Sequence, residues 1–275
     1  MGGQMELGLW REGELALACA KGDHAEARRW LNEGADPFWT RHALSLFDDC
    51  VRGDHVECLK LLQHARKVAG PEASIKAEAH ALRNAARHGA MRCCAQLLLT
   101  VDPHARDDMG MTALMWAASV GEPECVALLV TGSEADAVDN RGDRAIHFAC
   151  LRAVGPKELK CLRELWNRCD MRAKGSDGTG MLCQIARRSP ISSLEEVLSW
   201  GQAVWTDADV QEALVGAGSR DAARAALKDW QRARHERVEL VHELGLACRG
   251  ASPLGLKSEG RDTEEAAGRG KRGRL

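Results

Sequence analysis

The chain has 275 residues with a formal net charge of −2, and 45% of its residues are hydrophobic. This composition supports a folded core and excludes a fibrous or a wholly disordered protein. The near-neutral balance argues against nucleic acid as the main ligand, because proteins that bind nucleic acids usually carry a strongly basic surface. No apolar run approaches the roughly 20 residues needed to cross a bilayer, so no membrane partner is expected.

The first residues of the chain and its cysteines indicate an intracellular protein. The first residues, MGGQMELGLWREGE, lack the basic and apolar regions of a secretory signal. The 11 cysteines include no C-x-x-C pair, so neither a disulfide scaffold nor a finger-like zinc site is expected. We therefore expect no metal, no cofactor, thiols that fill the core, and a location in the cytoplasm or the nucleus.

A pattern of Leu, two small residues and Gly recurs along the chain. In its clearest copy, Leu114 is followed by Ala117 and Ala118 and then by Gly121. The marker glycines and their equivalents stand at positions 22, 53, 89, 121, 155 and 189, with a period near 33 residues. A period of this length is typical of a solenoid built from stacked helical repeats.

In chain order, residues 1–12 are expected to form an N-terminal segment that precedes the repeats. The repeat array is expected over residues 13–205, as about six units of two short helices each. The stretch GPEASIKAEA at 70–79 is expected to be a linker between the second and third units. Residues 206–248 predict a degenerate repeat followed by a C-terminal helix. Residues 249–275 are rich in Gly and charge, so we expect a disordered basic tail there.

The fourth unit shows why each copy should contain two helices. Thr112 can cap the first helix through its hydroxyl group, and Gly121 can end that helix in the left-handed conformation. Pro123 suits the first turn of the second helix, because its missing N–H would be unsatisfied there in any case. The stretches DDMG at 107–110 and DNRG at 139–142 have turn composition. The chain is therefore expected to reverse its direction twice in every unit.

These residues resemble the ankyrin repeat, whose consensus runs D-x-x-G-x-T-P-L-H-x-A-A-x-x-G-H before a second apolar helix. The resemblance rests on Asp107, Gly110, Thr112, Leu114, Ala117, Ala118 and Gly121 in the fourth unit, and on Asp139, Gly142, Ile146, His147 and Ala149 in the fifth. It implies an all-α solenoid of stacked helix–turn–helix repeats with a helical C-terminal cap. It also implies that His147 is a structural corner residue.

Two sets of residues are candidates for a partner-binding surface. In the ankyrin family the end of the inner helix lines a concave groove, and five of the six units here place a cation at that end. The helix-end candidates are Lys21, Arg52, Arg87, His88, Arg152, Arg187 and Arg188, and the turn-tip candidates are Met109, Met111, Asn140, Arg141 and Asp143. Stacked in register, the cations would attract an acidic partner protein. The alternative is that each cation only complements the dipole of its own helix.

No catalytic constellation is recognisable, since the chain has no Walker loop, no dinucleotide-binding glycine pattern and no Gly-x-Ser-x-Gly elbow. We therefore expect a monomeric, non-catalytic module that binds a partner protein in the concave groove of the array. One alternative is an adaptor that recruits substrates to a ubiquitin ligase. It rests on Leu244 and Cys248, which are spaced as in the degradation-adaptor box that follows some ankyrin arrays. Another alternative is an enzyme whose site the sequence does not reveal.

Overall fold

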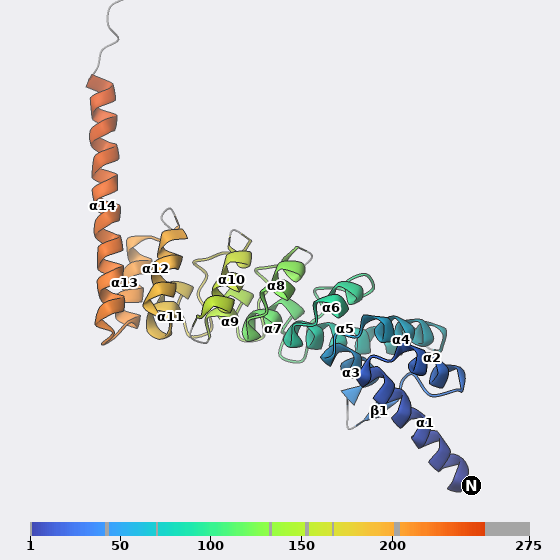
Figure 1. The fold of residues 1–275 in the computed structure, drawn as a ribbon. Coiled ribbons are helices and arrows are strands. Elements are labelled where there is room, and N and C mark those ends of the chain that lie inside the picture. The colour runs from blue at the N-terminus through green and yellow to red at the C-terminus, as the bar shows by residue number, and fades with distance from the viewer. Residues whose placement is uncertain are drawn as a thin grey trace, which may run out of the picture. The chain divides into compact units, whose positions relative to one another are not determined.

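The structure, a computed structural model, describes residues 2–41, 44–69, 71–131, 134–151, 154–166, 168–200 and 204–250. The chain divides into two compact units, Met1–Gln231 and Arg232–Leu275. Most of the described residues lie in helices (Figure 1). The candidate residue Arg152 and residues 251–275 of the expected tail lie outside the described residues.

The first unit is a row of helix pairs, each made of an inner and an outer helix. The inner helices are α1 (Gly2–Lys21), α3 (Leu46–Arg52), α5 (Pro71–His88), α7 (Ala113–Val120), α9 (Ala145–Cys150), α11 (Met181–Arg188) and α13 (Asp207–Gly216). The outer helices are α2 (His24–Asn32), α4 (Val56–Ala69), α6 (Met91–Leu97), α8 (Pro123–Val130), α10 (Pro156–Leu165) and α12 (Ile191–Trp200). Each inner helix contacts the next one along the row, as Figure 1 shows.

Helix α14 (Asp221–Gly250) closes the first unit with its initial turns and then continues into the second unit. Ala223 and Leu227 of these initial turns are buried. The indole N–H of Trp230 donates a hydrogen bond of 3.0 Å to the carbonyl of Leu198 in α12. The all-α repeat fold with a helical C-terminal cap, expected from the sequence, is therefore confirmed. The strands in the described part of the chain are β1 (Thr40–Arg41) and β2 (Leu44–Ser45), which form a two-residue antiparallel ladder.

Two expected boundaries differ in the structure. Helix α1 begins at Gly2, so residues 2–12 share one helix with the first repeat instead of forming a separate segment. The predicted linker over 70–79 is wrong, because from Pro71 onward these residues form the first turns of α5. The stretch is rich in Ala, Glu and Lys, which favour helix, and proline is tolerated in the first turn of a helix.

The predicted starts and ends of the helices in the fourth unit are confirmed. The hydroxyl of Thr112 accepts a hydrogen bond of 3.4 Å from the N–H of Met115 and so caps α7. Gly121 ends α7 with φ 84°, in the left-handed region that a residue without Cβ adopts at little cost. Pro123 occupies the first turn of α8. These local signals produce the two reversals of the chain in this unit.

Small and thiol side chains line the contacts between inner helices. Ala86, Ala118 and Ala186 are buried, as are Cys19 and Cys150 at the equivalent repeat position. The ten cysteines whose side chains the structure describes are free thiols, and nine of them are buried. Burial raises the pKa of the Cys150 thiol, which keeps it un-ionised inside the core. The expectation that the thiols fill the core is therefore confirmed for these positions.

Successive turns are joined by hydrogen bonds on the inner side of the row. The backbone N–H of Asn140 donates to the carbonyl of Met109 at 3.0 Å, and its side-chain amide donates to the carbonyl of Asp108 at 2.9 Å. One repeat further on, the N–H and the hydroxyl of Ser176 both donate to the carboxylate of Asp143, each at 2.7 Å. The turns therefore support one another instead of standing free in solvent.

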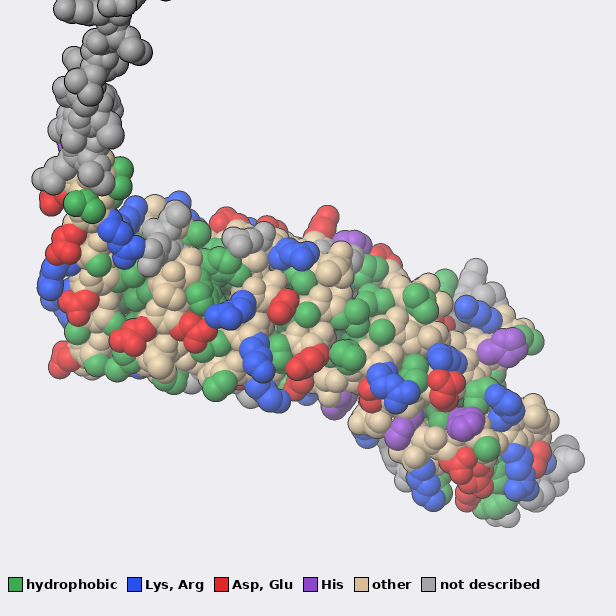
Figure 2. All heavy atoms as spheres, turned by 45° about the horizontal axis from the view of Figure 1, so that its top comes forward, with side chains coloured by type: hydrophobic (Ala, Val, Ile, Leu, Met, Phe, Trp, Pro, Cys, Tyr) green, Lys and Arg blue, Asp and Glu red, His purple; other side chains and the backbone are tan. Residues whose placement is uncertain are grey.

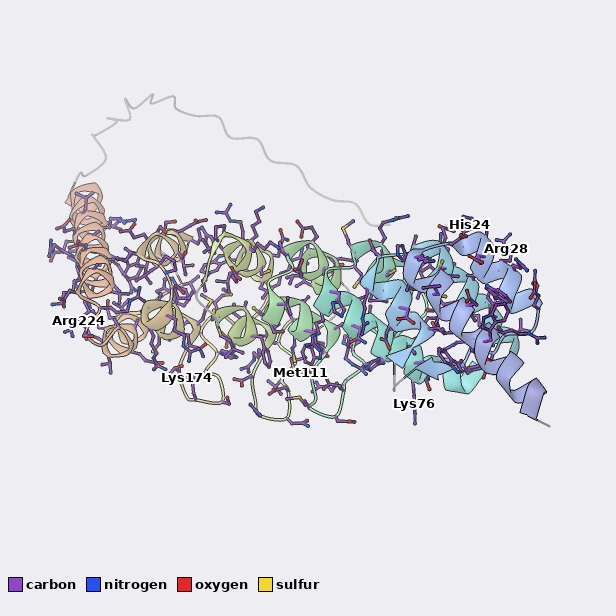
Figure 3. All side chains as sticks on the ribbon, turned by 60° about the horizontal axis from the view of Figure 1, so that its bottom comes forward. His24, Arg28, Lys76, Met111, Lys174 and Arg224 are labelled. Atoms are coloured by element: carbon purple, nitrogen blue, oxygen red, sulfur yellow. The ribbon has the colours of Figure 1, made fainter. Side chains whose placement is uncertain are left out.

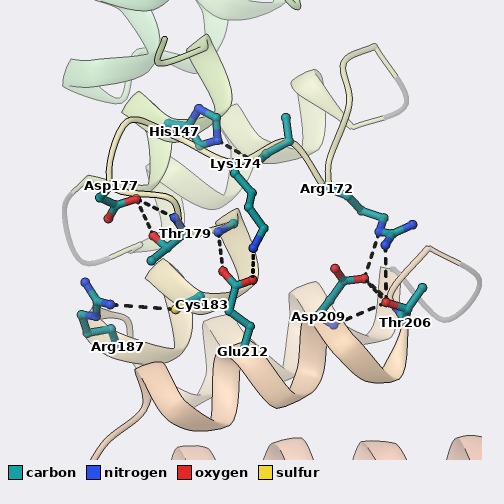
Figure 4. Close-up of polar contacts among 12 residues, drawn as sticks. His147, Arg172, Lys174, Asp177, Thr179, Cys183, Arg187, Thr206, Asp209 and Glu212 are labelled. Carbon is teal, nitrogen blue, oxygen red and sulfur yellow. Dashed lines mark hydrogen bonds and ion pairs between the residues drawn. The ribbon is translucent and has the colours of Figure 1, made fainter. Parts of the chain in front are cut away.

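The structural role that the resemblance gives to His147 is confirmed. The side chain is 1% exposed. Its Nδ1 accepts a hydrogen bond of 3.0 Å from the N–H of Arg144, and its Nε2 lies 2.9 Å from the carbonyl of Ala173 (Figure 4). Because Nδ1 is an acceptor, Nε2 carries the proton and donates to that carbonyl. The ring thus ties the start of α9 to the loop that leads into the next repeat.

Ion pairs fasten the last repeats to the C-terminal cap (Figure 4). Lys174 lies 2.7 Å from the carboxylate of Glu212 in α13, and Glu212 also accepts from the N–H of Gly180 at 2.9 Å. Arg172 lies 3.0 Å from the carboxylate of Asp209, near the first turn of α13. These contacts supply polar links at the end of the array, where the last repeat has no further repeat to stack on.

The turn glycines Gly110 and Gly142 allow a matched test of the turn geometry. Both have positive φ, 78° and 93°. A Cβ added at Gly110 would lie 2.8 Å from the backbone nitrogen of Asn140, whereas one added at Gly142 would meet nothing within 4 Å. We expect Gly142→Ala to lower the free energy of unfolding by about 1–2 kcal/mol through backbone strain alone. Gly110→Ala should lower it by at least about 1 kcal/mol more, because the added methyl group also collides with the next turn.

The measurement is urea unfolding of each variant followed by circular dichroism. Equal losses for the two variants would contradict the close approach of neighbouring turns.

Candidate functional site

A cavity of about 610 Å³ opens on the inner side of the row, between α5 and α7. Helix α5 supplies one long wall, while α7 contributes Trp116 and the turn at 106–109 supplies the rest. Helix α5 supplies more of the lining than α7 does, because α5 has 18 residues and α7 has only 8. Figure 3 shows Lys76 and Met111 on the turn side of the array, with His24 and Arg28 of α2 on the opposite side.

Buried polar contacts hold the N-terminal half of α5 in place. The carboxylate of Glu78, which is 4% exposed, accepts hydrogen bonds from the amide of Gln63 at 2.9 Å and from the hydroxyl of Thr100 at 2.8 Å. Hydrogen bonds to a buried charge are among the stronger ones in proteins. They connect α5 to α4 and to the segment after α6, so the long wall of the cavity has a rigid support.

Trp116 forms a fixed platform in the cavity. Its indole N–H donates to Oδ2 of Asp107 at 2.9 Å, while Oδ1 of the same carboxylate accepts from the N–H groups of Met109 and Met111, both at 2.9 Å. The guanidinium of Arg87 lies 5.2 Å from the centre of the Trp116 ring. Such a cation over an indole face is attractive. Both oxygens of Asp107 therefore help to hold the turn and the ring together.

Arg83 supplies an unsatisfied donor in the wall of the cavity. Its Nη1 atom is buried and has no hydrogen-bond partner among the described residues. Burial lowers the pKa of Arg83, and the nearby carboxylates of Asp107 and Asp108 act in the opposite direction. An arginine nevertheless stays charged at physiological pH. The wall of the cavity thus contains a positively charged group.

An acidic side chain beneath the cavity joins α3 to α5. The carboxylate of Asp48 accepts hydrogen bonds from Asn84 and from the backbone N–H of Ser45, and it lies 3.5 Å from the ring of His80. Burial by itself would raise the pKa of Asp48, but the hydrogen bonds from His80, Asn84 and Ser45 together lower it to about 2. The hydrogen bond to Asp48 in turn raises the pKa of His80.

The predicted helix-end residues have different surroundings. Those within the described residues are all exposed: Lys21, Arg52, Arg87, His88, Arg187 and Arg188. Of these, only Arg87 lines the cavity between α5 and α7. Arg188 donates to the carbonyl of Leu151 at 2.7 Å, so it links the end of α11 to the end of α9. Arg187 approaches the sulfur of Cys183 at 4.0 Å (Figure 4).

The turn-tip candidates also differ in their exposure and contacts. Met109 is 48% exposed and lines the cavity, and Arg141 is exposed at the next turn. The prediction that Met111 contacts a partner is wrong, because its side chain is only 3% exposed. Gly110, with its positive φ, turns the chain back so that Met111 packs into the core. Asn140 and Asp143 carry the hydrogen bonds between turns described above.

The cavity residues that were not predicted from the sequence include Lys76, Arg83, Arg106 and Trp116. The spacing of positions 76, 80, 83 and 87 offered a signal, because residues three or four apart lie on one face of a helix. This spacing was not recognised because residues 70–79 were predicted to be a linker and not part of a helix. Arg106 lies outside any helix and donates to the carbonyl of Val138, a contact that no local pattern indicates.

The family comparison covers part of the cavity. Residues 82–182 match a family model described as ankyrin repeats, in three copies. These residues are similar to ankyrin repeats. The match includes Arg83, Arg87, Trp116 and the turns on the inner side. No curated protein matches the sequence significantly.

Ankyrin repeats are generally protein–protein interaction modules and are typically non-catalytic. Among the described residues, no helix has both the length and the apolar character to cross a bilayer. The same part of the chain holds no group of three or more side chains suited to bind a metal ion.

The low pKa of Asp48 predicts a specific acid sensitivity. A carboxyl group whose folded pKa of about 2 lies below its ordinary value of 3.8 stabilises the fold above pH 3.8, and this contribution is lost as the pH falls through 2. Between pH 5 and pH 3, the free energy of unfolding of the wild type should fall by about 1 kcal/mol more than that of Asp48→Asn. Urea unfolding at each pH measures the difference, and parallel curves for the two proteins would contradict it.

Arg188 contacts a neighbouring repeat, whereas Arg187 contacts a residue of its own helix. We expect Arg188→Gln to lower the free energy of unfolding by about 0.5–1 kcal/mol, because the bond to Leu151 is lost. Arg187→Gln changes the same charge on the same helix and should leave stability within about 0.5 kcal/mol of the wild type. The reverse order in thermal or urea unfolding would show that the contact of Arg188 is not formed in solution.

Proposed function

We propose that this protein is a non-catalytic recognition module that binds a partner protein along the inner side of its ankyrin repeats. The observation that carries the proposal is the platform of Trp116, fixed by Asp107 and faced by Arg87, in an open cavity beside a partly unsatisfied Arg83. A rigid aromatic ring with arginines around it is the kind of surface from which protein interfaces draw most of their binding energy.

The lining of the cavity supports binding over catalysis. The lining residues include no Ser, Thr or Cys that could act as a nucleophile. His80, the one group there suited to proton transfer near neutral pH, is engaged by Asp48 in a contact that holds α3 against α5. We therefore propose that the protein has no enzymatic activity of its own.

The charges around the cavity favour an acidic partner. Lys76, Arg83, Arg87 and Arg106 outnumber the two carboxylates of Asp107 and Asp108. On the side of the array shown in Figure 2, by contrast, Lys and Arg alternate with Asp and Glu. We further propose that the protein acts as a monomer, in the cytoplasm or the nucleus, and that nucleic acid is not its ligand, because carboxylates are interleaved with the cations.

A second candidate function is that of an adaptor for a ubiquitin ligase. It is favoured by three exposed aliphatic side chains on α14 within the second unit, Val238 at 61%, Leu240 at 55% and Val241 at 68%. Aliphatic groups gathered on an exposed helix often mark a contact with another protein. The side chains of Leu244 and Cys248 lie outside the described ones.

Photo-crosslinking in the protein's own cells distinguishes the candidate surfaces. p-Benzoylphenylalanine is placed at Met109 on the inner side, at the exposed Arg28 on outer helix α2, and at Val241 on α14. We expect protein adducts from Met109 and none from Arg28. Adducts from Arg28 without any from Met109 would contradict the proposal, and adducts from Val241 alone would favour the adaptor.

A further inference from the structure

Between α5 and α7 the structure assigns a two-part subsite: a positive half that takes a carboxylate and an apolar half that takes a neighbouring side chain. The inference rests on the proposed function and names the chemistry of the partner at this site. We propose that the partner docks an extended peptide segment in which an acidic residue is followed closely by an apolar one.

The positive half is built by three side chains of α5. Lys76, Arg83 and Arg87 line the same cavity and follow a helical spacing that places them on one face. The buried Nη1 of Arg83 has no hydrogen-bond partner among the described residues. A carboxylate in the cavity would lie beside the charged groups of Lys76, Arg83 and Arg87, and hydrogen bonds between ionised groups are among the stronger ones in proteins.

The carboxylates already present do not fill this role. Both oxygens of Asp107 accept hydrogen bonds from its own turn and from Trp116. Asp108 is exposed, so solvent screens much of its attraction for the arginines. Arg106, on the other wall, donates to the carbonyl of Val138 and contributes long-range attraction. Positive charge therefore remains in excess at the α5 wall.

The apolar half lies beside the positive one. Ala79, Met109 and Trp116 line the cavity together, and Met109 is 48% exposed. A methionine next to a rigid indole can adapt to aliphatic side chains of different shape. A ligand with a carboxylate alone would leave this apolar surface exposed to water. A segment with an acidic residue close to an apolar one would contact both halves of the subsite.

The probe is the fluorescein-labelled peptide Gly-Ser-Glu-Leu-Glu-Leu-Gly-Ser, measured by fluorescence anisotropy with the full chain. Two matched peptides replace both Glu with Gln or both Leu with Ser. We expect each replacement to weaken binding by at least about fivefold, since each removes the group for one half of the subsite. Added salt should weaken the parent peptide more than the Gln peptide, because exposed charges are screened.

The protein variant is Arg83→Gln with Arg87→Gln, and the matched control is Arg28→Gln with Lys160→Gln on outer helices, which removes the same charge. The first should weaken the parent peptide by at least about tenfold, and the control by less than about twofold. If the double variant does not fold by circular dichroism, Arg87→Gln alone is compared with Arg28→Gln. Equal binding by the Glu and Gln peptides, or equal effects of variant and control, would overturn the inference.

Two further outcomes keep this inference separate from the proposed function. If the photoreactive residue at position 109 still crosslinks to the same partner protein in the Arg83→Gln/Arg87→Gln variant, the proposed recognition function is retained and the carboxylate subsite is wrong. If a 12-nucleotide DNA strand displaces the parent peptide from the wild type but not from the variant, the subsite belongs to phosphate groups. An absence of any Met109 adduct in the wild type would instead remove the proposed function itself.

Discussion

The structure depends on one constraint: a single helix pair of this chain cannot bury its own apolar side. Ala117 and Ala118 of α7 are almost fully buried, and they are so because α5 and α9 lie on either side of them. Small side chains at these positions allow the inner helices to approach closely, and stacking then forms one continuous core. The turns are brought into register by the same stacking, which is why Asn140 reaches the turn before it and Ser176 reaches Asp143.

The candidate site follows from a local departure from this regularity. Helix α5 is longer than the inner helices that flank it, and its extra turns have no counterpart on α7. Glu78 fixes those turns from below through Gln63 and Thr100, so the departure is rigid. The space that remains opposite them is lined by side chains whose charges and ring are already oriented. Little ordering is then required when a partner binds, and preorganisation of this kind favours affinity.

The sequence predicted the repeat period, the helix pairs and the caps of the fourth unit, because these depend on residues close together in the chain. Thr112, Gly121 and Pro123 each act within one or two turns of helix. The site was predicted only in part. Arg87 and Met109 were identified, but Met111 is buried because the conformation of Gly110 directs it inward. The helical nature of 70–79 was obscured by Gly70 and Pro71, although Pro71 begins the helix instead of breaking it.

Contacts between distant residues explain what local patterns could not give. Arg66 lies between the rings of Phe38 and Phe47, 5.0 and 4.1 Å from their centres, and donates to the carbonyl of Pro37. An arginine in the core is unusual without such partners, and its burial cannot be read from its neighbours in the sequence. The pairing of Asp107 with Trp116 is local in sequence, yet its value as a binding platform appears only when Arg87 from the preceding repeat is placed over the ring.

The central claim is that the inner side of the stacked helix pairs is the recognition surface. Amide hydrogen exchange, measured on the full chain alone and in complex with the protein that crosslinks at Met109, tests it most directly. The account predicts slower exchange on complex formation at residues 83–88 and 106–112, with little change in the outer helices α6 and α8. Slower exchange confined to α6 and α8, with the inner turns unchanged, would contradict it.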